Sequence, residues 1–166
     1  MIRILAMISG LLGGLALSQF PEFSQQYLQR LSGAVNELKV IVDGFDEVAN
    51  DVGQSREEAL DSMPDSGVGA QVKQGLARAI SRYERLDADL QSLRAAGPVQ
   101  RLAQPWNIAD RQLVRDTLED YKPAVPATID GAITAGIGYL LGWGMVFLSL
   151  RWVASLFHRP RKRARG

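Results

Sequence analysis

Four acidic side chains in the first half of the chain are the first candidates for chemistry. Asp43, Asp46, Glu47 and Asp51 lie close together in the sequence, and carboxylates are the ligands that Ca²⁺ and Mg²⁺ prefer. The segment from Asp43 to Glu47, however, lacks the spacing of oxygen ligands that a calcium loop requires. The cluster is typical of the solvated face of a helix, so the sequence predicts no metal site.

The residue types that perform most catalysis are scarce. The chain has no cysteine and one histidine, His158, which lies in the C-terminal tail. No thiolate site or disulfide is therefore possible. Ser55-Arg56-Glu57-Glu58 has the pattern of a capping box at the start of a helix. Gly67-Val68-Gly69 is typical of a turn, because no Lys-Ser/Thr follows it as in a phosphate-binding loop. We expect no enzyme activity, no catalytic residue and no cofactor.

Both ends of the chain carry a long uncharged segment, residues 4–20 and residues 131–150. A helix of roughly 20 apolar residues, and at least about 17, spans the bilayer core. Small residues recur at every fourth position in both segments. Such ladders allow two helix backbones to approach closely, so we expect helix packing in the membrane, either between the two segments or across a dimer. The packing residues are Ala6, Gly10, Gly14, Ser18, Thr134, Gly138 and Gly142.

The first segment has a second interpretation. Met1-Ile2-Arg3 and the apolar run to Leu15 could form a signal peptide, with Ala16-Leu17-Ser18 as its cleavage site. The small-residue ladder and the following Gln19-Phe20-Pro21 favour an anchor that is not cleaved. Either interpretation exports the residues that follow.

Charge predicts the orientation. Residues 21–126 contain 17 acidic and 12 basic side chains, whereas the tail from Arg159 contains five basic and no acidic ones. Basic residues near membrane segments stay in the cytoplasm, so both termini are predicted to be cytoplasmic and residues 21–126 periplasmic. Anionic lipid headgroups are the nearest partner for the tail, and we expect no nucleic-acid partner. The residues for this role are Arg151, Arg159, Arg161, Lys162, Arg163 and Arg165. Asp130 lies about one turn into the second segment, where it suits the helix N-terminal dipole better than an ion site.

Apolar side chains in the middle follow helical periodicity. They predict a long helix over residues 27–52, a short one from Ser55, a second long one over residues 68–96 and a third after a cap at Asn107. The fold class is all-α, with two transmembrane helices flanking an extracytoplasmic helical hairpin or bundle. The expected boundaries are 1–20, 21–126, 127–157 and a tail of 158–166. The expected bundle core is Leu28, Leu31, Val35, Leu38, Val42, Phe45, Leu76, Tyr83, Leu86 and Leu90.

The stripe on the first long helix is wider than the stripe on its hairpin partner. The edge that carries Ile41 and Val48 is therefore covered only in part, and exposed apolar stripes usually mark contact surfaces. We expect this edge to support a homodimer or a contact with another membrane protein.

Several local strings resemble a known family. They include Ser18-Gln19-Phe20-Pro21-Glu22-Phe23, the run from Gln25 to Val35, Ser55 to Leu60, and Pro123-Ala124-Val125-Pro126. Together they resemble a proteobacterial family of short inner-membrane proteins classed only as a domain of unknown function. The resemblance implies an inner-membrane location and carries no site residues. The sequence thus favours a non-catalytic scaffold or accessory subunit, with a periplasmic sensor or ligand-binding module as the alternative.

Overall fold

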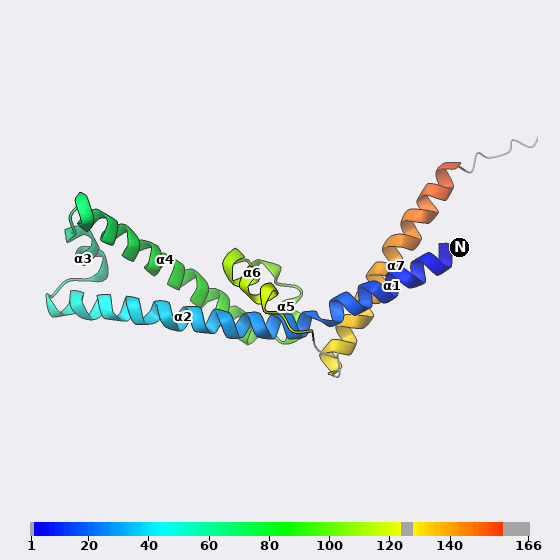
Figure 1. Cartoon of the computed structure of the whole chain (residues 1–166), viewed down its shortest axis with the longest axis horizontal. Coiled ribbons are helices and arrows are strands. Elements are labelled where there is room, and N and C mark those ends of the chain that lie inside the picture. The colour runs from blue at the N-terminus through cyan, green and yellow to red at the C-terminus, as the bar shows by residue number, and fades with distance from the viewer. Residues whose placement is uncertain (1, 124–127, 158–166) are drawn as a thin grey trace, which may run out of the picture. The chain divides into compact units, whose positions relative to one another are not determined.

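The computed structural model describes residues 2–123 and 128–157, and these residues contain helices but no strand (Figure 1). Two long apolar helices at the ends of the chain flank the helical elements of the middle. The contacts divide the chain into two compact units, one formed by the two ends and the other by residues 24–121. The all-α class and the placement of the two apolar helices agree with the prediction from sequence.

The terminal unit is a pair of helices, α1 (Ile2–Ser18) and α7 (Ile129–Phe157). The segments Arg3–Asp51, which continues beyond α1, and Ile129–Val153 are each long and apolar enough to cross a membrane. At 1.5 Å per residue, the 29 residues of α7 extend over about 44 Å. The two helices pack against each other, so each has one face toward its partner and the rest of its surface outward.

Helix α2 (Phe20–Asp51) begins one residue after α1 ends. The interruption is at Gln19, whose backbone N–H donates to the carbonyl of Ala16 over 3.3 Å. Pro21 follows in the first turn of α2, where its missing N–H removes no intrahelical bond. The sequence therefore places a helix boundary, and not a helix interior, at this proline.

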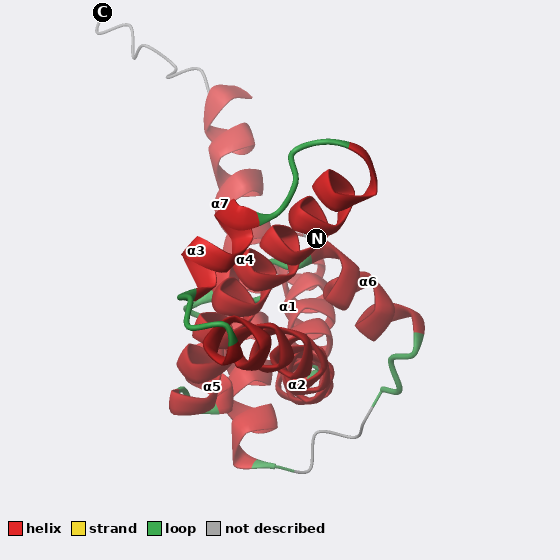
Figure 2. Cartoon of the chain, turned by 90° about the vertical axis from the view of Figure 1, so that its left-hand side faces the viewer, coloured by secondary structure: helices red, strands yellow, loops and turns green. Residues whose placement is uncertain are grey.

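The middle unit begins as a hairpin of α2 and α4 (Gly67–Ala95), with α3 (Arg56–Ser62) between them in sequence. The two long helices lie close together near α5 and diverge toward α3 (Figures 1 and 2). Gly53 ends α2 with a φ of 72°, a conformation that glycine adopts without steric cost. The predicted capping box is confirmed: Ser55 accepts from the Glu58 N–H and the Glu58 carboxylate accepts from the Ser55 N–H.

Two short elements, α5 (Pro98–Arg101) and the 3₁₀ helix η1 (Pro105–Asn107), connect α4 to α6 (Arg111–Glu119). The predicted cap at Asn107 is wrong. Asp110 caps α6, because its carboxylate accepts from the Leu113 N–H over 3.1 Å. Asn107 instead turns inward and donates to the Ser92 hydroxyl over 2.7 Å. A buried contact with α4 therefore takes the side chain that local sequence would use as a cap.

The core of the middle unit joins α2, α4 and α6. Four predicted core residues belong to the buried cluster, three pack against it in part, Val42 is buried outside it, and Phe45 and Leu76 are half-buried. The cluster also contains Tyr27, Leu93 and Leu113, which were not on the predicted core list. The predicted members of the cluster are Leu31, Val35, Leu86 and Leu90, with Leu28, Leu38 and Tyr83 against them.

Candidate helix-packing sites

The contact between α1 and α7 is made by backbone. A Cβ atom added to Gly138 would lie 2.2 Å from the carbonyl oxygen of Gly13, and one added to Gly142 would lie 2.4 Å from the carbonyl oxygen of Ser9. No side chain fits at such distances, so glycine is required for this approach. The Ser9 hydroxyl donates to the Gly142 carbonyl over 3.0 Å, which adds a polar contact across the pair.

The small residues that the sequence singled out are distributed along this contact. In α1 the residues Ala6, Gly10, Gly14 and Ser18 are all buried. In α7 Thr134 and Gly138 are buried, and Gly142 is half-buried. Gly13 lies outside the period-four ladder, yet it makes the closest approach to Gly138. Its only signal in the sequence is that it stands next to Gly14, so that the helix presents two adjacent glycines.

The outward surface of the pair is apolar. Leu11 and Leu15 on α1 and Leu140 and Met145 on α7 are each more than three-fifths exposed. Trp143 and Phe147 stack with ring centroids 4.9 Å apart along one side of α7. Thr134 is polar and fully buried, but its hydroxyl donates to the Asp130 and Gly131 carbonyls, each over 3.0 Å. The pair therefore offers an apolar surface outside and satisfied polar groups within.

The first turn of α7 contains Asp130. The capping bond, however, comes from Thr128, whose hydroxyl accepts from the Gly131 N–H over 3.1 Å. Asp130 is thus placed where the helix dipole favours a carboxylate, without itself making the cap. At the other end Arg151 is exposed. The remaining basic residues expected to bind lipid, Arg159, Arg161, Lys162, Arg163 and Arg165, lie outside the described residues.

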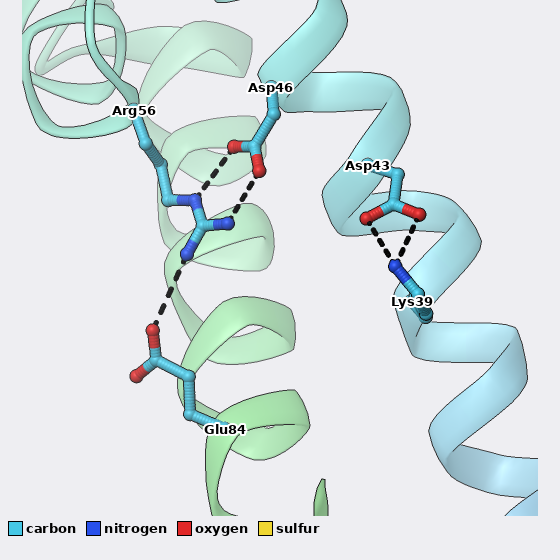
Figure 3. Close-up of polar contacts among 5 residues, drawn as sticks. All are labelled: Lys39, Asp43, Asp46, Arg56 and Glu84. Atoms are coloured by element: carbon cyan, nitrogen blue, oxygen red, sulfur yellow. Dashed lines mark hydrogen bonds and ion pairs between the residues drawn. The ribbon is translucent and has the colours of Figure 1, made fainter.

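At the far end of the hairpin, Arg56 joins three helices (Figure 3). Its Nε and Nη2 donate to the Asp46 carboxylate of α2 over 2.7 and 2.5 Å, and its Nη1 donates to Glu84 of α4 over 3.4 Å. The guanidinium lowers the pKa of the Asp46 carboxyl through these hydrogen bonds. Lys39 pairs similarly with Asp43 one turn along α2. Within the described residues, no three acidic or histidine side chains are arranged to hold a metal ion.

The connection between α4 and α6 contains a buried cation. The Arg101 side chain is 7% exposed, and its Nε donates to the Leu93 carbonyl over 2.9 Å. Its Nη1 has no hydrogen-bond partner, and burial lowers the pKa of the guanidinium. Burial also raises the pKa of the Tyr27 phenol to about 12. Both groups belong to the packed interior, and neither opens into a described cavity.

A groove of about 490 Å³ runs between α2 and α6. Its polar side chains are already engaged, because Arg30 pairs with Asp120 and Arg82 pairs with Asp110 and Gln112. A ligand carboxylate would have to displace these partners. The groove is thus better described as the seam along which α6 packs on α2. Its lining residues are Arg30, Gly33, Ala34, Glu37, Leu38, Ile41, Arg82, Gln112, Leu113 and Asp116.

Comparison with known proteins gives a family and no activity. No curated protein and no solved structure matches the chain. The family described as "Protein of unknown function (DUF2937)" matches residues 1–159, which is nearly the whole chain. This agrees with the expected domain of unknown function, and the chain belongs to the DUF2937 family.

Proposed function

We propose that this protein is a non-catalytic membrane protein that acts as a scaffold or accessory subunit through helix packing. The observation that carries the proposal is the terminal pair, in which two apolar helices are joined through glycine backbone and surrounded by exposed apolar side chains. In water such a surface would be an aggregation liability. In lipid it costs nothing, and close backbone packing is what holds membrane helices together.

The proposed orientation places both termini in the cytoplasm of a bacterium and the hairpin in the periplasm. It is supported by the basic residues at the C-terminal end and by the net acidic middle. Because the chain contains no cysteine, single cysteines report their side of the membrane. An impermeant thiol reagent should label Asp61→Cys in intact spheroplasts and leave Ala164→Cys unlabelled. The reverse pattern refutes the orientation, and release of the protein by alkaline carbonate refutes membrane integration.

The first helix should remain attached in the mature protein. A signal peptide is discarded and has no need of a packing surface, whereas here Gly10, Gly13 and Gly14 all contact α7. Intact mass spectrometry of the membrane-extracted protein decides this. A mature chain that begins at Gln19 contradicts the proposal.

The scaffold function is favoured over the sensor alternative by the groove between α2 and α6. Ligand-binding pockets are usually lined by apolar walls with a few free polar groups. In this groove the two arginines are held by the protein's own carboxylates and amide. Purification in mild detergent separates the two functions. A stoichiometric protein partner supports the scaffold, and a co-purifying small molecule supports the sensor.

A further inference from the structure

One edge of α2 carries a continuous line of residues spaced by three or four positions. It begins with the residues that line the groove against α6 and continues beyond them, toward the α3 end of the hairpin. We name the later part, Ile41, Gly44, Val48 and Val52, the distal edge. Because the spacing is that of one helix face, the surface that α6 covers and the distal edge belong to the same side of α2.

Helix α6 shows how this side of α2 receives a helix. Leu113 of α6 lies in the buried cluster with Leu31 and Val35 of α2. Asp120, just after α6, pairs with Arg30 of α2. In Figure 1 α6 lies over the part of α2 near α5 and does not extend to the end near α3. The same helical side is therefore occupied in its first half and vacant in its second.

The vacant half is apolar. Ile41 is 49% exposed, Val48 is 61% exposed and Val52 is 67% exposed. No atom lies within 4 Å of the position that a Cβ of Gly44 would occupy. A glycine inside a helix costs about 1 kcal/mol relative to alanine, and nothing within the chain requires the small residue there. An apolar stripe with a gap at its centre suits a second helix approaching from outside.

Charge selects the kind of helix. From Glu37 to Asp65 the chain has nine acidic and two basic residues. Both basic side chains, Lys39 and Arg56, are held in ion pairs. Glu47 and Asp51 flank the distal edge, and no basic side chain of the described residues pairs with either. A second copy of this chain would bring two acidic surfaces together, and an anionic lipid surface would be repelled in the same way.

We propose that the distal edge of α2 binds a cationic amphipathic helix of a partner protein. Its apolar face would cover Ile41, Val48 and Val52, with the backbone passing close to Gly44. Its basic residues would lie beside Glu47 and Asp51. Charge complementarity of this kind sets partner choice and association rate as well as affinity. This inference deepens the proposed scaffold function, and rests on it, by stating the chemistry of the partner.

The test uses the full chain in micelles of an uncharged detergent and two fluorescent peptides of about 18 residues, long enough to form helix when bound. One peptide has leucine and lysine in an amphipathic repeat, and the other has glutamate in place of lysine. Fluorescence anisotropy should show binding of the leucine–lysine peptide only. Ile41→Ser with Val48→Ser should weaken this binding about tenfold. Leu118→Ser, which removes an exposed apolar side chain from α6 outside the groove, should leave it unchanged.

A charge-reversed variant provides a second line of test that does not depend on the apolar residues. Glu47→Lys with Asp51→Lys should weaken binding of the lysine peptide and allow binding of the glutamate peptide. Equal binding of both peptides to the wild type, or wild-type affinity in both variants, overturns the proposal. It is also overturned if light scattering shows a wild-type dimer that Ile41→Ser with Val48→Ser converts to a monomer. Carbonate extraction tests the membrane function separately, so the two proposals can fail independently.

Discussion

The contact between α1 and α7 predicts a large effect from a single methyl group. In Gly142→Ala the new Cβ would lie 2.4 Å from the carbonyl oxygen of Ser9 and 3.1 Å from its carbonyl carbon. An ordinary carbon–oxygen contact is about 0.8–1 Å longer than the first distance, so the helices must move apart by nearly that amount. A gap of about 0.5–1 Å loses a quarter to a half of each dispersion contact across it. The hydrogen bond from Ser9 to Gly142 would be stretched as well.

The expected destabilisation can be estimated from these losses. Overpacking a tight interface costs about 1–3 kcal/mol, and a hydrogen bond between membrane helices contributes about 0.6 kcal/mol. Alanine returns up to about 1 kcal/mol through its higher helix propensity. The net loss of contact free energy is therefore about 1–2.5 kcal/mol, which corresponds to roughly a fivefold to seventyfold change in an equilibrium constant.

A disulfide reports this free energy directly. The Cβ of a residue at Gly14 would lie 3.5 Å from the Cβ of Tyr139, which is within the range for a disulfide. In a chain with Gly14→Cys and Tyr139→Cys, the equilibrium between dithiol and disulfide in a glutathione buffer measures how strongly the helices hold the two thiols together. Adding Gly142→Ala should reduce that equilibrium constant by the factor given above.

The same helix provides the matched control. No atom lies within 4 Å of the position that a Cβ of Gly144 would occupy, so Gly144→Ala should leave the disulfide equilibrium unchanged or favour it slightly. If Gly142→Ala and Gly144→Ala behave alike, the glycines serve only to lower helix propensity or to adapt to lipid. The backbone contact between α1 and α7 would then not hold the pair together.

Three further changes probe the middle unit. Arg56→Gln should lower the free energy of unfolding in denaturant by about 1 kcal/mol at neutral pH. Arg56 lowers the pKa of Asp46, so the stabilisation is present above the ordinary carboxyl pKa and lost as pH falls through the lowered value; the difference between variant and wild type should shrink below about pH 4, and a constant difference contradicts this. Arg101→Met should cost less than about 1 kcal/mol, because removing a buried cation with an unpartnered Nη1 offsets the lost bond to Leu93, and a loss above about 2 kcal/mol would show that the guanidinium is essential. Gly44→Ala should raise the thermal midpoint of the free protein while weakening the leucine–lysine peptide, and a gain in both would remove Gly44 from the proposed contact.

Local signals in the sequence were sufficient for most helices. The capping box at Ser55 and the Gly-Pro pair after α4 mark real boundaries, because caps and helix stops depend on residues within one turn. The cap at Asn107 failed for a physical reason. Asparagine and aspartate are equally good N-caps, and only the contact of Asn107 with Ser92, distant in sequence, leaves Asp110 to do the capping.

Contacts between helices were predictable in kind but not in detail. Periodicity identified the face of α2 that holds Leu31 and Val35, since that face is set by the helix itself. It could not identify Gly13, because the point of closest approach depends on how α1 and α7 cross. The role of Arg56 was equally invisible, since its partners Asp46 and Glu84 come from two other helices. Long-range geometry decides such pairs, and sequence spacing carries no record of it.

The glycines of this chain divide according to what their missing side chains permit. At Gly13, Gly138 and Gly142 the space of a Cβ is taken by backbone of the other helix, so the glycine is explained within the chain. At Gly33 and Gly44 that space is empty, although each lies inside a long helix where glycine weakens the helix by about 1 kcal/mol. Both stand on the side of α2 where α6 packs, one beside the groove and one on the distal edge. Since the terminal pair uses glycine to bring helices together, the same residue on α2 favours a helix that the chain itself does not supply.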